Sequence, residues 1–280
     1  MAETLALHGG TPVRARLLPY AHQTIDEDDV QAVVAALRSD WLTTGPAVEA
    51  FERAVASAVE SRHAVAVNSG TAALHAAVFA VGIRPGDEVI TSPLTFAASA
   101  NAVLYLGGTP IFADIRPDTL NVDSAEIEAR ITPKTRAILP VDFAGQPCDL
   151  DALGHLAHAR GLTMIEDAAH ALGASHKGHP VGAIADLTTF SFHPAKLITT
   201  GEGGMVTTNR DDLAPRLRRF RNHGLETDFR ERTERGAPYS PMVDLGYNYR
   251  LSDLQCALGA SQLSKLEPLL KRRELIAERY

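Results

Sequence analysis

Lys196 is surrounded by residues that favour covalent chemistry. It ends the run Ser191-Phe192-His193-Pro194-Ala195-Lys196, and Gly201-Glu202-Gly203-Gly204 follows almost at once. A lysine beside a buried strand loses solvation, so its charge must be removed, paired or used. An amine whose pKa is lowered in this way can form a Schiff base with an aldehyde. Taken alone, the run is more often a surface lysine on an ordinary loop.

A possible anion site lies earlier in the chain, where a β-rich run gives way to a helical pattern. The segment is Asn68-Ser69-Gly70-Thr71-Ala72-Ala73. Small residues at a helix N-terminus let backbone amides approach an anion, and the helix dipole favours negative charge. Thr71 adds a hydroxyl donor. A plain helix cap made by Ser69 or Thr71 explains the segment equally well.

Phe96 follows the next β-rich run, in Pro93-Leu94-Thr95-Phe96. An aromatic side chain at the end of a strand can cover the face of a planar ring. By itself, Phe96 is as typical of the ordinary core.

Two acids and a histidine end a third apolar run, Thr163-Met164-Ile165-Glu166-Asp167-Ala168-Ala169-His170. A partly buried carboxylate needs a cationic partner, so Asp167 is suited to a protonated heterocyclic nitrogen. Glu166 and Asp167 could instead bind a metal. We expect no metal site, because no histidine spacing typical of one accompanies them. Capping by Asp167 is the structural alternative.

Together, these segments describe a site for pyridoxal phosphate (PLP). The 68–73 segment would hold the phosphate with help from Ser191, Phe96 would cover the ring, and Asp167 would keep the pyridine nitrogen protonated. Lys196 would hold the aldehyde, be released by the substrate amine and then move a proton at the substrate Cα. Four such segments in this order are improbable as coincidence.

The elements that must position these residues alternate between strand and helix. Short β-rich runs at 63–67, 88–91, 111–113, 137–141, 162–165, 188–192 and 205–208 are separated by helical patterns such as 70–81, 97–106 and 150–160. This alternation predicts an α/β fold, with a mostly parallel central sheet covered by helices on both faces. In such sheets ligands collect at the carboxyl ends of the strands. No Gly-x-Gly-x-x-Gly follows the first core strand, so a dinucleotide site has little support.

Composition narrows the class of protein. The 280 residues carry a net charge of −7, which does not favour nucleic-acid binding. The arginine cluster between Arg216 and Arg221 lies on a helical pattern and is expected to be a solvated face. Two cysteines fit a reducing cytoplasm rather than a disulfide framework. We expect no signal peptide and no membrane span.

With Gly246-Tyr247-Asn248-Tyr249-Arg250, the motifs above resemble the DegT/DnrJ/EryC1/StrS family of PLP-dependent sugar aminotransferases, over essentially the whole chain. The resemblance implies PLP-dependent transferase fold type I, aspartate aminotransferase-like, and a homodimer with active sites shared at the interface. It implies that Asn248 is lent to the neighbouring subunit's cofactor. It also implies roles for the residues already named: Lys196 at the cofactor aldehyde, Asp167 at the pyridine nitrogen, Phe96 on the ring, His170 at the ring hydroxyl, and Gly70, Thr71, Ala72 and Ser191 at the phosphate.

Within the family, several stretches look most like the transaminase of pseudaminic acid biosynthesis. They are Pro19-Tyr20, 39–46, 144–149 and 198–204. This likeness implies amination at C4 of a UDP-linked 4-keto-6-deoxy-N-acetyl hexosamine, with glutamate as amino donor. It also implies a substrate site lined by Tyr20, Asp40, Trp41, Leu42 and Thr43. Perosamine-type and other 4-amino-sugar transaminases share much of the pattern.

Two alternatives remain. A PLP-dependent sugar dehydratase of the family would have histidine in place of the Schiff-base lysine, whereas Lys196 is present here. A non-catalytic module would lack the lysine or the aspartate. We expect residues 1–250 to form an N-terminal arm and a large PLP-binding domain, and 251–280 to begin a truncated C-terminal small domain. If this truncation is real, the fragment could be inactive.

Overall fold

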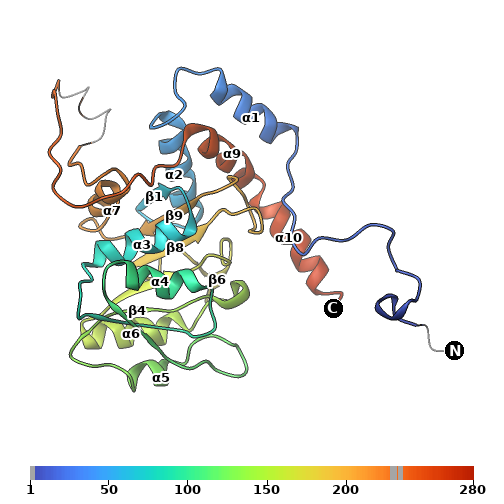
Figure 1. Cartoon of the computed structure of the whole chain (residues 1–280), viewed down its shortest axis with the longest axis horizontal. Helices are drawn as coiled ribbons and strands as arrows, with labels where there is room; N and C mark the ends of the chain where they lie inside the picture. Colours follow the sequence, from blue (N-terminus) through green and yellow to red (C-terminus); the bar gives the residue numbers. More distant parts are fainter. Residues whose placement is uncertain (1–3, 228–231, 233–235) are drawn as a thin grey trace.

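A computed structural model describes residues 4–227, 232 and 236–280, and its centre is a seven-stranded sheet (Figure 1). The strand order is β1-β9-β8-β5-β4-β2-β3. Neighbouring strands from β8 to β3 run parallel, while β9 is antiparallel to both β8 and β1. The mostly parallel sheet is therefore confirmed, and the reversed strand β9 was not anticipated. The strands are β1 (His63–Val67), β2 (Glu88–Thr91), β3 (Thr109–Phe112), β4 (Thr135–Leu139), β5 (Thr163–Asp167), β8 (Leu187–Ser191) and β9 (Gly204–Thr208).

Helices cover both faces of the sheet, as expected. On one face α3 (Gly70–Val81), α4 (Ala97–Tyr105) and α7 (Ala214–Arg221) share a core with alternate residues of the central strands. On the other face α5 (Ser124–Glu128) and α6 (Leu150–Arg160) pack over β4 and β5. There α2 (Pro46–Ala58) and α9 (Asp253–Ser264) pack over β1, β8 and β9. A small hairpin, β6 (Ser175–His176) and β7 (His179–Pro180), precedes β8.

Local sequence explains the limits of α3, the helix that begins at the predicted anion site. The Ser69 hydroxyl caps its start by accepting a hydrogen bond from the amide of Ala72 at 3.0 Å. The helix ends at Gly82, whose φ of 88° is in the left-handed region that favours glycine. A capped start and a glycine stop explain why the expected bounds of 70–81 agree with the structure.

Residues 4–26 form an N-terminal arm that extends away from the sheet (Figure 1). Its side chains are solvent-exposed, and Val13 is fully so; the segment holds one short 3-10 helix, η1 (Ala6–His8). The arm leads into α1 (Glu27–Leu37), which packs against α9. The buried carboxylate of Asp29 makes this contact by accepting hydrogen bonds from Ser261 Oγ at 2.7 Å and Gln262 Nε2 at 2.6 Å.

Residues 251–280 form α9 and then α10 (Leu266–Ala277). Helix α9 packs against both α1 and α2, so it joins the arm to the large sheet-containing body. Among the helices of the described residues, none combines the length and the apolar composition needed to cross a membrane.

One expectation about α7 is wrong. Arg221, placed on a solvated face by its position in the arginine cluster, is largely buried: its side chain is 15% exposed. It forms an ion pair with Glu52 and donates a hydrogen bond to the carbonyl of Ala66 at 2.8 Å. Because the same Glu52 carboxylate accepts from the amide of Ala66, the pair ties α2 and α7 to β1. Buried charge is tolerated here because it is paired and hydrogen-bonded.

Candidate active site

Lys196 lies in the turn after β8, half-buried, at the carboxyl end of the strand. The turn is held by Phe192, a fully buried side chain whose carbonyl accepts from the amide of Thr200 at 3.0 Å and the hydroxyl of Thr199 at 3.0 Å. Burial lowers the pKa of the Lys196 amine, and the negative charge of Asp167 opposes this effect. The environment therefore moves the amine toward its neutral, nucleophilic form.

Asp167 ends β5 and is 5% exposed. Its carboxylate accepts hydrogen bonds from Ser99 Oγ at 2.7 Å and from the amide of Ala169 at 3.2 Å. Burial raises the pKa of Asp167, whereas these two hydrogen bonds and the charges of His170 and Lys196 lower it. Both hydrogen-bond donors given above are neutral. A buried carboxylate of this kind fits a bound cationic nitrogen such as that of a protonated pyridine.

His170 and Lys196 belong to the same electrostatic group as Asp167. Partial burial and the charge of Lys196 lower the pKa of His170, and Asp167 opposes the shift. The backbone beside His170 is also packed closely, because a Cβ placed on Gly145 would lie 2.7 Å from the His170 carbonyl oxygen. The structure thus brings together three residues that the sequence placed after two separate strands.

The predicted phosphate residues lie beside this group. A Cβ placed on Gly70 would lie 2.8 Å from Cβ of Ser191, so the first turn of α3 touches the end of β8. Only glycine allows this approach without movement of Ser191. The amides of Gly70 and Thr71 open the helix, where backbone N–H groups have no intrahelical acceptor. The amide of Ala72 is used by the Ser69 cap. The contact of Gly70 with Ser191 therefore forms a surface of small groups that is suited to a bound anion, the anion cradle.

Phe96 precedes the first turn of α4 at the same end of the sheet and is 79% exposed. It is therefore not an ordinary core residue, the alternative left open by its sequence context. An exposed aromatic ring in this position is available to cover a planar ligand.

The remaining expected residues come from other segments of the chain. Tyr20 is fully exposed on the N-terminal arm. The segment 40–43 connects α1 and α2 and is tied to the start of α9, because the Leu42 carbonyl accepts from the amide of Asp253 at 3.0 Å. Asn248 is exposed, and its carbonyl accepts from Asn68 Nδ2 at 3.4 Å, next to the anion cradle.

Residue-by-residue reading of the sequence missed Ser99. This side chain is fully buried in α4, donates to Asp167 and lies 2.7 Å from the hydroxyl of Thr95. One feature of the sequence could have indicated Ser99. It is a serine among the alanines of an apolar helix, one turn after Thr95, and a buried serine needs a hydrogen-bond partner. Nothing local, however, indicated that its partner lies 68 positions later in the chain.

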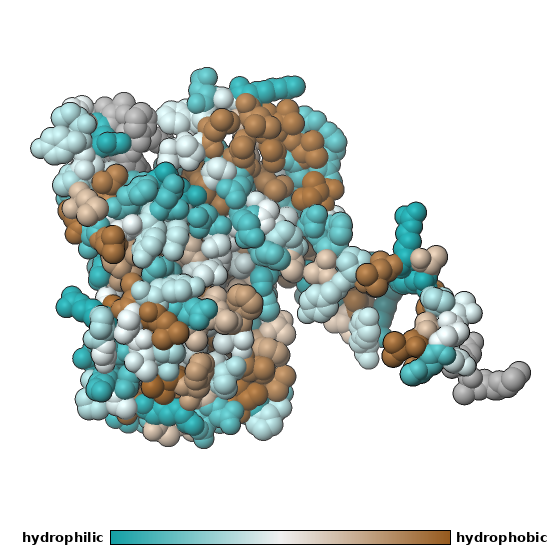
Figure 2. Space-filling model, in the orientation of Figure 1, coloured by the Kyte–Doolittle hydropathy of each residue, from teal (hydrophilic) through white to brown (hydrophobic). Residues whose placement is uncertain are grey.

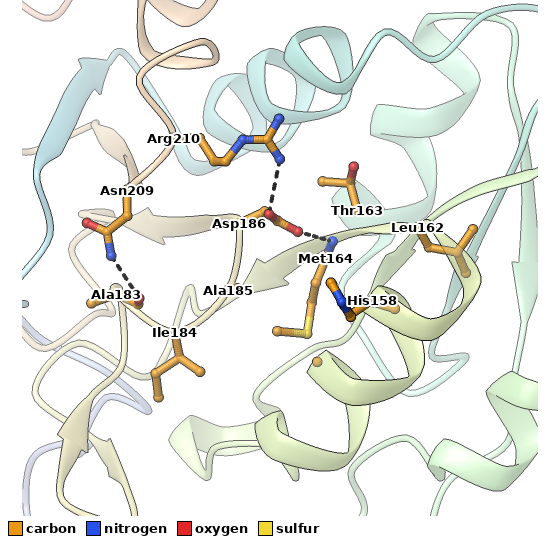
Figure 3. A pocket seen from close by; sticks show the side chains of 13 residues that line it. His158, Leu162, Thr163, Met164, Ala183, Ile184, Ala185, Asp186, Asn209 and Arg210 are labelled. Carbon is orange, nitrogen blue, oxygen red and sulfur yellow. Dashed lines mark hydrogen bonds and ion pairs between the residues drawn. The ribbon is translucent and has the colours of Figure 1, made fainter.

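A cavity lies at the opposite end of β5 from Asp167. It has a volume of about 500 Å³ and is lined by α6, by the start of β5 and by segments before β8 and after β9 (Figure 3). Its charged and amide groups are already paired: Asp186 accepts from the amide of Met164 at 2.9 Å and from Arg210 at 3.3 Å. Asn209 Nδ2 donates to the Ala183 carbonyl at 3.0 Å. Since Thr163 begins the strand that Asp167 ends, this cavity is separate from the candidate active site.

Carboxylates 166 and 167 do not form a common metal site. Successive side chains of a strand point to opposite faces, and the hydrogen bonds agree: Asp167 contacts Ser99 of α4, whereas Glu166 contacts Thr188 of β8.

Solved structures with this fold identify the class of protein. Spr1654 of Streptococcus pneumoniae, assigned as a sugar aminotransferase, was solved in a PMP-form and a PLP-form. Its PMP-form has a TM-score of 0.89 and 34% identity, covering 94% of this chain and 71% of that chain. The fold is that of the PLP-dependent aminotransferases, and the residues at the carboxyl ends of the strands fit this cofactor.

Residues 23–280 match the DegT/DnrJ/EryC1/StrS aminotransferase family, and the chain belongs to it. Two other proteins are similar to it. The spore coat polysaccharide biosynthesis protein SpsC of Bacillus subtilis is 47% identical over 268 residues, which are 95% of this chain and 69% of SpsC. PseC of Helicobacter pylori, an aminotransferase involved in pseudoaminic acid biosynthesis, has a TM-score of 0.82 and 35% identity, covering 89% and 66% of the two chains. The protein is a PLP-dependent sugar aminotransferase.

Proposed function

We propose that the enzyme transfers the amino group of glutamate to C4 of a UDP-linked 4-keto-6-deoxy-N-acetyl hexosamine, the amination step of a pseudaminic acid pathway. One observation carries the chemistry: Lys196, Asp167 and His170 act on one another electrostatically beside the Gly70–Ser191 contact. The similarity to PseC supports this class of sugar. The similarity to SpsC supports a nucleotide sugar destined for a polysaccharide.

The proposed roles of the residues follow from their positions. Bound PLP supplies an aldehyde that carries the amino group and a ring that takes up electrons. Lys196 would hold the aldehyde carbon until the amine of the donor displaces it. The freed Lys196 amine, shifted toward its neutral form, would then move the proton at the substrate carbon. Asp167 holds the proton on the ring nitrogen. The remaining residues would orient the cofactor: Phe96 on the ring face, His170 at the ring hydroxyl, and Gly70, Thr71, Ala72 and Ser191 at the phosphate.

We further propose a homodimer in which Asn248 reaches the partner subunit's cofactor. Exposed apolar side chains support an interface. They gather over α1 and along the N-terminal arm (Figure 2), where Leu7 is 87% exposed and Leu37 is 55% exposed. Large apolar side chains gathered on an open surface are typical of a protein that associates. The sugar nucleotide would lie between the arm and the α1–α2 connection, in contact with Tyr20, Asp40, Trp41, Leu42 and Thr43.

Two further proposals concern the division of the chain into domains and the compartment in which the enzyme works. Residues 1–250 form the arm and large domain, and 251–280, with α9 packed on α2, begin the small domain. The enzyme works in the cytoplasm, in agreement with two buried, unpaired cysteines, Cys148 and Cys256.

A different 4-keto sugar nucleotide, as in a perosamine-type synthase, is the second candidate, because similar solved structures include other sugar enzymes, such as DesI with its TDP-sugar product. A sugar dehydratase is disfavoured by the lysine at position 196. The discriminating experiment supplies glutamate with a panel of keto sugars that differ in nucleotide and in the group at C2. We expect amination of the UDP-linked N-acetyl sugar at a kcat/KM at least about 100-fold higher than for analogues without the N-acetyl group. Equal rates across the panel would contradict the proposed substrate.

A further inference from the structure

Two buried carboxyl groups lie behind Asp167, on the opposite face of β5. Glu166 is 0% exposed and Asp142 is 1% exposed. Asp142 follows β4, the strand beside β5, and its amide donates to the carbonyl of Asp167 at 3.0 Å. The two acids therefore contact the backbone that places Asp167, while their side chains lie outside the proposed cofactor site.

One oxygen of each carboxyl is accounted for by a neutral donor. Asp142 Oδ1 accepts from the amide of Cys148 at 3.0 Å, and Glu166 Oε2 accepts from the hydroxyl of Thr188 at 2.8 Å. The other two oxygens, Asp142 Oδ2 and Glu166 Oε1, are buried and find no donor within the described part of the chain. Yet the pairing of β4 with β5 and the bridge between Val141 and Asp167 place the two side chains beside each other, and a hydrogen bond between them contributes to both pKa shifts. Two ionised carboxylates cannot form such a bond, whereas one proton between them satisfies both oxygens.

Electrostatics agree with this arrangement. Burial raises the pKa of Asp142, and burial together with the charge of Asp142 raises the pKa of Glu166 well above its usual value. The other titratable groups acting on the pair are Cys148, on the loop before α6, and Asp167, on the far face of β5. The pKa of the buried Cys148 thiol is raised, so it stays neutral. None of these neighbours supplies a positive charge.

We propose that Asp142 and Glu166 share one proton and act as a positioning pair, which fixes the end of β5 and keeps a single negative charge behind Asp167. This inference rests on the proposed role of Asp167. The shared proton matters because two further full charges would favour protonation of Asp167 and cancel its anionic character. The remaining single charge favours the protonated state of a ring nitrogen bound by Asp167.

The proton itself is tested on the chain without cofactor. In Glu166→Gln the amide nitrogen replaces the shared proton as donor to Asp142, while the amide oxygen still accepts from Thr188. We expect infrared spectra near pH 6 to show a protonated-carboxyl band in the wild type that is absent from Glu166→Gln. The band should persist in Glu60→Gln, a control at an exposed glutamate.

Urea unfolding gives a second readout of the same proton. A carboxyl whose pKa is raised in the folded state binds a proton that the unfolded chain releases, so stability falls as pH rises between the two pKa values. Above pH 4.5, the usual pKa of a glutamate side chain, the unfolding constant of the wild type should therefore rise relative to Glu166→Gln by up to tenfold per pH unit. Parallel pH curves and an unchanged infrared band would overturn proton sharing.

The positioning role is tested on the PLP-loaded enzyme with Asp142→Asn/Glu166→Gln. This double variant removes the charge of the pair. A hydrogen bond between the side chains is kept when the new amide at 166 turns over, so that its oxygen accepts from the new amide at 142 and its nitrogen donates to the Thr188 hydroxyl. We expect the pH midpoint of the bound cofactor's absorbance change to fall by on the order of one unit, with no change in Glu60→Gln. An unchanged midpoint would overturn the electrostatic role even if the shared proton is present. The infrared and unfolding experiments need neither cofactor nor substrate. If the proposed sugar amination fails, these experiments still show whether Asp142 and Glu166 share a proton.

Discussion

The hydroxyl of Ser99 donates a 2.7 Å hydrogen bond to Oδ2 of Asp167, and this bond joins helix α4 to the carboxyl end of β5. Both side chains are buried. The bond fixes one carboxylate oxygen, and the amide of Ala169 holds the other at 3.2 Å. Asp167 is thus oriented by the protein before any ligand arrives, which reduces the ordering needed when a cationic ring nitrogen binds.

Loss of the Ser99 hydroxyl should weaken this orientation. In Ser99→Ala one hydrogen bond that favours the ionised form disappears, so the pKa of Asp167 rises further. Hydrogen bonds to charged groups contribute about 1.5–3 kcal/mol. We therefore expect kcat to fall by about 10- to 100-fold, measured as steady-state transamination. Ser57→Ala, at an exposed serine of α2, is the control and should retain full activity.

Removal of the negative charge of Asp167 should have a larger effect. Asp167→Asn can still accept a hydrogen bond from Ser99 but cannot hold a proton on the ring nitrogen. We expect kcat to fall at least about 100-fold, with little change in the free energy of unfolding. Stopped-flow absorbance with glutamate measures the effect directly. A variant within a few-fold of the wild-type rate would show that another residue is the partner of the nitrogen.

Gly70→Ala tests the anion cradle. The added Cβ would lie 2.8 Å from Cβ of Ser191, so the start of α3 and the end of β8 must separate. Overpacking of this kind costs about 1–3 kcal/mol, and we expect the Kd for PLP to rise by about tenfold or more. Fluorescence titration with PLP measures the Kd. Gly154→Ala is the matched control, because its Cβ meets only Met164 Cε at 3.8 Å inside helix α6; this variant should bind PLP normally.

Acid sensitivity should arise partly from His75, a 2% exposed side chain of α3. Its Nδ1 lies 3.2 Å from the hydroxyl of Tyr249, and burial lowers its pKa from 6.5 to about 4. Between these values the unfolded chain binds the proton and the folded chain does not, so stability is lost as pH falls from 6.5 to about 4. The loss is on the order of 3 kcal/mol. Urea unfolding across this range should show a shallower pH dependence in His75→Gln than in the wild type; equal slopes would contradict the assignment.

Most of the framework follows from local sequence. The helix at 150–160 was expected with its exact bounds, because Asp149 caps its start and Gly161, at a φ of 64°, ends it. The reversed direction of β9 was not predictable in this way, since a strand's partner depends on the path of the chain through residues far away.

Within the candidate site, too, some residues could be predicted from local sequence and others could not. Residues that follow strands, such as Lys196 and Asp167, could be identified because parallel strands gather their carboxyl ends. Residues that act from a distance could not. Ser99 lies on a different element from Asp167, and Asp142 meets Glu166 only through the pairing of β4 with β5. Arg221 was misjudged for the same reason, because its partner Glu52 is on α2.

The most direct test of the account is an absorbance spectrum of the chain with PLP, recorded before and after glutamate is added. We predict a visible band from cofactor bound at Lys196, and its replacement by the band of the amine form when glutamate is present. Lys196→Ala should show neither change, whereas Lys134→Ala, at an exposed lysine, should behave as the wild type. The central claim would be contradicted if Lys196→Ala gave the same visible band with PLP and the same response to glutamate as the wild type.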